Sequence, residues 1–222
     1  MTTHITTIGA GPAGVAAARA AAKAGARVTL IGAELPGGRA EWHSLLPSKV
    51  LLTAADSLAM AEHFEALGLS GSTGGMPDIK ALSQRICALS QTRNETRLAD
   101  LTRRGVQFLH GTAAFPSAHR LRITPTEGTP YSMEADAIIV ASGSVPIFPP
   151  GLKPDGGRII APRFVSKLSD LPTSMAVVGA GVTGTEFVYA FIRLGIAVTW
   201  LVDEFGSCHH STAERYPCWW RP

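Results

Sequence analysis

Apolar and polar positions along the chain predict two similar strand–turn–helix–strand units. In the first unit, residues 4–8 and 27–31 are short and rich in β-branched residues, and residues 15–24 between them are rich in alanine. The second unit repeats this order, with apolar runs at 176–178 and 197–202 flanking a helical stretch that starts at Glu186 and ends at Leu194. Strands that alternate with helices of this length are typical of α/β proteins with parallel sheets.

Between the two units, the pattern predicts long helices followed by short strands. A glycine-rich loop leads into a helical stretch at 47–67, and residues 79–104 show the spacing of a long amphipathic helix that Gly105 ends. Residues 106–133 contain short extended runs, of which 106–109 and 112–115 are two separate ones. These runs predict a parallel strand followed by a small antiparallel meander. The continuous apolar run at 137–141 is typical of a strand buried on both faces of a sheet.

Two glycine motifs, GAGPAG at 9–14 and GAGVTG at 179–184, carry the strongest functional signal. Each lies between a predicted strand and a predicted helix, which is the context of a dinucleotide-binding loop. The first glycine permits a tight turn, the second lets the backbone approach a pyrophosphate at the helix N-terminus, and the third allows close helix–strand packing. A glycine-rich turn without a ligand is the alternative. The predicted contact residues are Gly9, Gly11, Pro12, Ala13, Gly14, Gly179, Gly181 and Gly184.

An acidic residue is expected near the end of the second strand of each unit, where it would bind a ribose. In the first unit Glu34 follows the strand end at Gly32, and in the second unit Asp203 follows Val202. Both carboxylates could reach a ribose from a shifted loop, or they could be solvated loop residues.

Composition and charge exclude several classes of protein. The 222 residues are 45% hydrophobic and 17% charged, and the net charge of +3 is spread along the chain, so nucleic acid binding is not implied. Three cysteines and the lack of a membrane span or secretory signal favour a soluble cytoplasmic protein. We expect no metal site, because the spacing of Cys208, His209, His210 and Cys218 matches no usual zinc pattern.

The order of these motifs resembles the pyridine nucleotide-disulfide oxidoreductases, the flavoprotein family of dihydrolipoamide dehydrogenase, glutathione reductase and mercuric reductase. The resemblance covers about residues 4–203 and includes a GG…PSK segment at 37–49, GVQFLHGTAAF, ADAIIVASGSVP and GAGVTGTEF. It implies a doubly wound, Rossmann-like α/β FAD-binding domain with a small antiparallel meander at 1–150. A partial second Rossmann-like domain for NAD(P) at 160–204 and an irregular tail at 205–222 would follow.

The resemblance also implies the cofactors and their contacts. FAD would bind the first motif and NAD(P)H the second, and Lys49 and Glu186 would form a catalytic pair beside flavin N5, where a cation stabilises reduced flavin. An exposed lysine and a helix-surface glutamate are the alternative. No Arg or Lys follows Val202 directly, which favours NADH over NADPH. The further FAD contacts implied are Gly38, Ser48, Lys49, Ala141, Ser142 and Gly143.

The chain departs from the family at the redox-active cysteines. The family's two cysteine positions correspond to Ala40 and Leu45, so no dithiol can form there. This disfavours reduction of disulfides or mercuric ion. Trp42 and His43 could contact a planar acceptor in the same loop, or Trp42 could pack the loop and His43 be solvated. Val182 stands where the family often has an aromatic residue that gates nicotinamide access.

We therefore expect an FAD-dependent oxidoreductase that passes a hydride from NAD(P)H to FAD and on to a non-dithiol small-molecule acceptor. The acceptor would be a quinone, oxygen or a second pyridine nucleotide. The alternative is a non-catalytic nucleotide-binding or interaction protein derived from the family. Because family members are longer, uncovered strand edges favour a homodimer or larger oligomer. His110 and His119 are expected to be structural.

Overall fold

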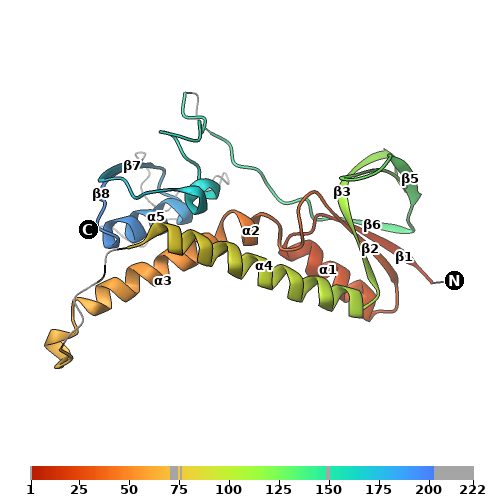
Figure 1. The fold of residues 1–222 in the computed structure, drawn as a ribbon. Coiled ribbons are helices and arrows are strands. Elements are labelled where there is room, and N and C mark those ends of the chain that lie inside the picture. The colour runs from red at the N-terminus through yellow and green to blue at the C-terminus, as the bar shows by residue number, and fades with distance from the viewer. Residues whose placement is uncertain (1, 71–74, 76, 149–150, 203–222) are drawn as a thin grey trace, which may run out of the picture. The chain divides into compact units, whose positions relative to one another are not determined.

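The computed structural model describes residues 2–70, 75, 77–148 and 151–202, and these form two compact units (Figure 1). Unit 1 comprises Met1–Leu46 and Ile86–Arg163, and unit 2 comprises Pro47–Arg85 and Phe164–Pro222. Each unit has a hydrophobic core of its own. No helix of the described residues is both long enough and apolar enough to cross a membrane.

Unit 1 is built on a six-stranded sheet in the order β5-β4-β3-β2-β1-β6. Its parallel part confirms the predicted α/β class, and it consists of β1 (His4–Ile8), β2 (Arg27–Gly32), the first half of β3 (Val106–Ser117) and β6 (Ala137–Val140). Helix α1 (Pro12–Lys23) connects β1 to β2. The first strand–turn–helix–strand motif predicted from the sequence is therefore present.

The second half of β3 belongs to an antiparallel meander with β4 (Arg120–Pro125) and β5 (Tyr131–Glu134). Figure 1 shows β3 running from the parallel strands into this meander. The prediction of two separate extended runs was wrong, because Gly111 lets the strand continue: a Cβ there would lie 2.4 Å from the carbonyl oxygen of Thr124. One strand therefore serves both parts of the sheet.

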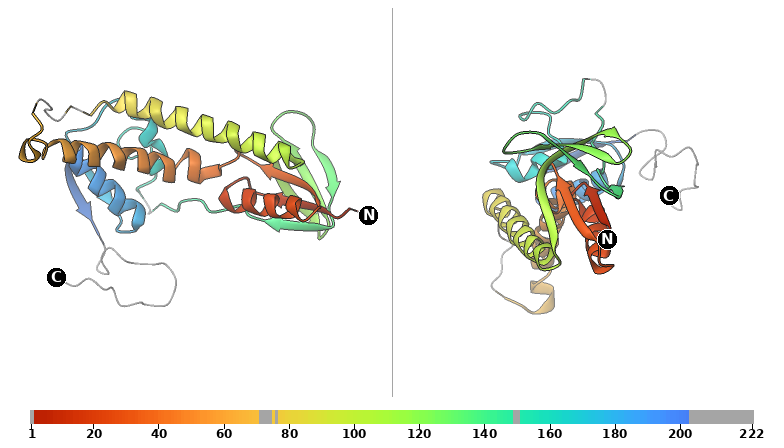
Figure 2. Two further views of the ribbon diagram at one scale, coloured as in Figure 1. Left: turned by 90° about the horizontal axis from the view of Figure 1, so that it is seen from below. Right: turned by 90° about the vertical axis from the view of Figure 1, so that its right-hand side faces the viewer.

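Helices cover one face of the parallel strands, and the meander covers the other (Figure 2). Leu30 of β2 packs with residues of α1 and of the C-terminal part of α4 (Ile79–Arg103). The next residue, Ile31, points to the opposite face and packs against Leu121 of β4. Successive side chains of a strand alternate between faces, so β2 contributes to both halves of the core.

Strand β6 is exposed, which corrects the prediction of a strand buried on both faces. It is an edge strand that pairs only with β1 among the described residues. Its last residue, Val140, is 62% exposed, and Ile139 is exposed as well. An apolar run alone cannot distinguish an edge strand from a central one, because that depends on which strands lie beside it.

Unit 2 contains a parallel strand pair, β7 (Ser174–Val178) and β8 (Ala197–Leu201), connected by α5 (Val182–Arg193). Phe187 and Phe191 of α5 stack with ring centroids 5.6 Å apart and pack with Leu51 in the core of the unit. The further elements of the unit are the part of α3 (Leu45–Ala61) from Pro47 on, η1 (Glu65–Leu67), the start of α4 and most of η2 (Pro162–Lys167).

Several helices differ from the prediction, and α1 begins at Pro12 rather than at residue 15. A short helix, α2 (Gly38–Trp42), lies in the predicted glycine-rich loop, and α3 already ends at Ala61. Helix α5 begins at Val182 rather than at Glu186, because Gly181 is its N-cap and the end of the glycine motif forms the first turn. Five residues are too few to show a helical period, so α2 had no detectable signal.

The core of unit 2 can be tested at Leu51, which is fully buried in α3. Leu51→Ala should lower the free energy of unfolding by about 2–5 kcal/mol, because it removes buried methyl groups and leaves a cavity. Met60→Ala is the control on the same helix, because Met60 is 63% exposed and should contribute less than about 0.5 kcal/mol. Denaturant unfolding followed by circular dichroism measures both, and equal effects would contradict this core.

Candidate functional site

The first glycine motif forms a tight turn between β1 and α1. Gly9 has a φ of +109°, a left-handed conformation that favours glycine. A Cβ on Gly14 would lie 1.7 Å from the carbonyl oxygen of Gly9, so the helix can pack on the turn only with glycine there. A Cβ on Gly11 would meet no atom within 4 Å. The space beside Gly11, at the N-terminus of α1, is therefore open, and Pro12 and Ala13 next to it are exposed.

The Gly37–Gly38 segment contacts this turn. The Gly37 N–H donates a hydrogen bond to the carbonyl oxygen of Ala10 at 2.8 Å. A Cβ on Gly38 would lie 2.8 Å from the Cα of Gly11, so the two backbones pack directly on each other. Gly38 thus lies next to the open space beside Gly11.

The segment after β6 contacts the same turn from another side. The Ala141 N–H donates to the carbonyl oxygen of Ile8 at 2.7 Å, and a Cβ on Gly9 would lie 2.0 Å from the Ala141 carbonyl oxygen. Ser142 and Gly143 follow directly and are exposed. Three segments far apart in the sequence therefore meet at the first glycine motif.

Arg39 lies among these segments, although sequence reasoning did not single it out. Its Nη1 donates to the carbonyl oxygen of Ser144 at 3.1 Å, which links the Gly37–Gly38 segment to the segment after β6. Arg39 adds a positive charge beside Gly38. Its position directly after two glycines could have drawn attention to Arg39 in the sequence. Its contact with Ser144, however, joins distant positions and leaves no sequence pattern.

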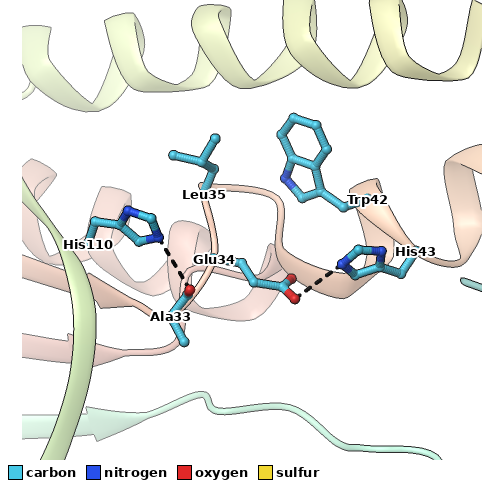
Figure 3. Close-up of a pocket in the computed structure, with 6 residues that line it drawn as sticks. All are labelled: Ala33, Glu34, Leu35, Trp42, His43 and His110. Atoms are coloured by element: carbon cyan, nitrogen blue, oxygen red, sulfur yellow. Dashed lines mark hydrogen bonds and ion pairs between the residues drawn. The ribbon is translucent and has the colours of Figure 1, made fainter. Parts of the chain in front are cut away.

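A pocket of about 280 Å³ opens beside Glu34, just after the end of β2 (Figure 3). Glu34 Oε1 and His43 Nε2 point toward each other and lie 3.2 Å apart, so His43 has a specific partner. His110 Nε2 lies 3.3 Å from the carbonyl oxygen of Ala33, and its ring stacks on Phe108. The lining residues are Ala33, Glu34, Leu35, Trp42, His43 and His110.

Trp42 contributes its aromatic ring to the lining of this pocket. Its indole Nε1 is buried and has no partner among the described residues. A buried donor without a partner costs free energy. The pocket thus combines aromatic surface with a carboxylate acceptor.

The second glycine motif, in unit 2, repeats the geometry of the first. Gly179 has a φ of +106°, and Gly181 caps α5 with φ −72° and ψ 175°, compared with −71° and −177° at Gly11. A Cβ on Gly184 would lie 2.2 Å from the carbonyl oxygen of Gly179, whereas one on Gly181 would meet nothing within 4 Å. The internal repeat predicted from the sequence is therefore present in three dimensions.

Several predicted residues lie outside the described part of the chain. Asp203, the expected second ribose contact, is one of them, and the cysteines and histidines at 208–218 are others. Within the described residues, no group of three or more His, Cys, Asp or Glu side chains could hold a metal ion.

Lys49 and Glu186 form an ion pair between α3 and α5 within unit 2. The hydrogen bond from Lys49 is the main cause that holds the pKa of Glu186 below its ordinary value, partial burial opposes this effect, and Ser48 adds a smaller lowering. Glu186 is therefore ionised at neutral pH. A second polar contact joins the same helices, because the Tyr189 hydroxyl donates to Asp56 Oδ1 at 2.7 Å.

The two positions where the family has cysteines lie in α2 and at the start of α3. Ala40 is in α2 and is partly buried, and Leu45 is exposed at the start of α3. The cysteine in the described part of the chain, Cys87, is exposed on α4. No thiol therefore stands at either position.

Comparison with known proteins agrees with this geometry. The family model described as pyridine nucleotide-disulphide oxidoreductase matches residues 3–210, which is nearly the whole chain. The chain belongs to this family.

Individual relatives within the family are similar over most of this chain. An NAD(P)H dehydrogenase (quinone) of Mycobacterium tuberculosis is 34% identical over 90% of the chain and 42% of its own length. A dihydrolipoyl dehydrogenase of Bacillus subtilis is 35% identical over 86% of the chain and 42% of its own length. The crystal structure of LpdA from Mycobacterium tuberculosis has a TM-score of 0.83 and 31% identity, over 90% of this chain and 45% of that one. The chain thus spans less than half of these relatives.

The lowered pKa of Glu186 predicts a pH-dependent stability. Because its folded-state pKa lies below the ordinary value of 4.5, ionised Glu186 stabilises the fold above that value, and this contribution is lost as the pH falls through the folded pKa. Glu186→Gln should therefore cost about 1 kcal/mol at pH 7 and little in strong acid. Unfolding midpoints measured from pH 7 down to acid test this. Glu134→Gln, at an exposed pair with Arg120, is the control.

Proposed function

We propose that unit 1 binds FAD across the first glycine motif and that the protein is an FAD-dependent oxidoreductase supplied with electrons by NAD(P)H. The open space beside Gly11 supports this proposal, because a pyrophosphate needs close access to the backbone there. The amides at the N-terminus of α1 and the positive charge of Arg39 would favour the anionic phosphates. Gly38, Ala141, Ser142 and Gly143 would surround the bound cofactor.

The pocket beside Glu34 fits the adenosine half of FAD. A carboxylate at the end of the second strand can accept hydrogen bonds from ribose hydroxyls. Trp42 would offer an aromatic surface to a planar base. Glu34 would have to share or release its contact with His43 when the ribose binds.

The second motif would hold the pyrophosphate of NAD(P)H at the N-terminus of α5. Gly181 leaves the backbone accessible there, as Gly11 does in the first motif. Asp203 would contact a ribose of the bound NAD(P)H. The lack of a basic residue directly after Val202 supports NADH as the preferred donor.

Lys49 and Glu186 would act beside the flavin ring. FAD, when bound, supplies the two-electron chemistry that connects NAD(P)H to the acceptor. Glu186 is ionised and holds the Lys49 ammonium by a charge-assisted hydrogen bond, so the cation keeps one position. A fixed positive charge would stabilise negative charge on a reduced ring more strongly than a mobile one. Ser48, buried next to Lys49, would support this arrangement.

The positions of the redox-active cysteines are where this chain departs from disulfide reductases. Ala40 and Leu45 carry no thiol, and this observation carries the proposal of a non-dithiol acceptor. The relative named NAD(P)H dehydrogenase (quinone) supports a quinone as that acceptor.

Gly11→Val tests FAD binding. The added side chain meets no protein atom within 4 Å at its Cβ, so the fold should persist while flavin retention falls at least about tenfold. Flavin absorbance per protein after gel filtration is the measurement. Gly14→Ala is the matched contrast, because its Cβ would overlap a backbone oxygen and should lower stability itself. Unchanged flavin content in Gly11→Val would rule out this site.

The acceptor is tested in a form of the protein that spans the full length of its relatives. It should oxidise NAD(P)H with quinone or dye acceptors and fail with lipoamide, glutathione disulfide and mercuric ion. Lys49→Ala should slow flavin reduction at least about tenfold in stopped-flow absorbance, with a smaller effect on NAD(P)H binding. Turnover of a disulfide without added thiol would contradict the proposal.

A further inference from the structure

Unit 1 contains a buried carboxylate, Glu41, to which the family resemblance gives no role. Glu41 lies in α2, three residues after Gly38, and is only 7% exposed. Arg97 of α4 donates a hydrogen bond from Nη2 to Glu41 Oε2 at 2.9 Å, and Arg93 Nε lies 2.5 Å from Oε1. A buried carboxylate is tolerated only when it is paired in this way.

Arg97 also holds the backbone in front of Glu41. Its Nη1 donates to the carbonyl oxygen of Pro36 at 3.0 Å, and its side chain is 18% exposed. A Cβ on Gly37 would lie 2.7 Å from that same Nη1, so the guanidinium packs directly on the glycine. One planar guanidinium thus binds both ends of the segment from Pro36 to Glu41 through two separate nitrogens, whereas a lysine has only one.

The opposite side of this segment touches the proposed pyrophosphate site. Gly37 donates to the carbonyl oxygen of Ala10, and Gly38 packs on the Cα of Gly11. The segment is therefore held between Arg97 on one side and the first glycine motif on the other. Arg97 therefore contacts the segment that packs on Gly11 at both of its ends.

We propose that Arg97, through Glu41 and the Pro36 carbonyl, is a positioning residue for the FAD site. It fixes the Gly37–Gly38 segment against Ala10 and Gly11 before the cofactor arrives, so binding does not have to order that segment. Such pre-organisation raises affinity by removing an entropic cost. This inference rests on the proposed binding of FAD to the first motif.

Helix α4 also has apolar contacts with the rest of unit 1, which do not involve this pair. Leu101 of α4 packs against α1 and β2, and Val106 joins the same cluster. Neither Arg97 nor Glu41 is part of that cluster. Loss of the pair should therefore loosen the Pro36–Glu41 segment more than the sheet, which separates a positioning role from a general structural one.

The test is FAD affinity in variants that remain folded. Removing Arg97 alone would leave Glu41 buried with one partner, so the decisive variant is the double change E41L/R97L, because apolar replacement of a buried pair is often tolerated. It should keep the thermal midpoint of the flavin-free protein near wild type and raise the Kd for FAD at least about tenfold. Quenching of FAD fluorescence during titration measures the Kd.

Conservative and distant variants complete the test. Arg97→Lys keeps the charge but not the two-sided contact, so its Kd should lie between wild type and E41L/R97L. Arg103→Met removes an arginine from the same helix that is 76% exposed and whose one ion pair among the described residues is with Asp100, so its Kd should equal wild type.

The outcomes separate this inference from the proposed function. If the wild-type chain binds no FAD, both are overturned. If wild type binds FAD and E41L/R97L binds it equally well, only the positioning role is overturned. An equal loss of affinity in Arg103→Met would also overturn it, because the effect would then be general destabilisation.

Discussion

Close backbone packing at Gly9 is the constraint on which unit 1 depends. The Gly9 N–H donates to the carbonyl oxygen of Ile31 at 2.8 Å, and the Ala141 carbonyl lies where a side chain on Gly9 would be. Helix α1 starts against the same residue through Gly14. Three segments therefore converge on a position without a side chain, and this convergence aligns β2, β1 and β6 while leaving Gly11 accessible.

Features coded locally could be predicted from the sequence. The two glycine motifs, the flanking strands and the long helix α4 all carry short-range patterns, and the structure contains them. Features that depend on neighbours could not be predicted in the same way. The exposure of Val140 follows from its place on an edge strand, and the unbroken course of β3 follows from how Gly111 meets Thr124.

The candidate site shows the same division. Lys49 and Glu186 are 137 positions apart, and only the family resemblance pointed to them as a pair. Glu34 and His43 were each noted in the sequence, but their mutual contact was not. Arg97 and Glu41, 56 positions apart, had no signal, because charged residues on a helix usually face solvent and their burial becomes visible only in three dimensions.

The strand order of unit 1 has a consequence for how the chain folds. Strand β1 is flanked by β2, which follows soon after it, and by β6, which comes much later: the backbone of His4 bonds Asp136, 132 positions away. During synthesis, one edge of β1 therefore stays unpaired until the residues of β6 have emerged. Such distant pairing makes folding slow and leaves an open edge available for mispairing on the ribosome.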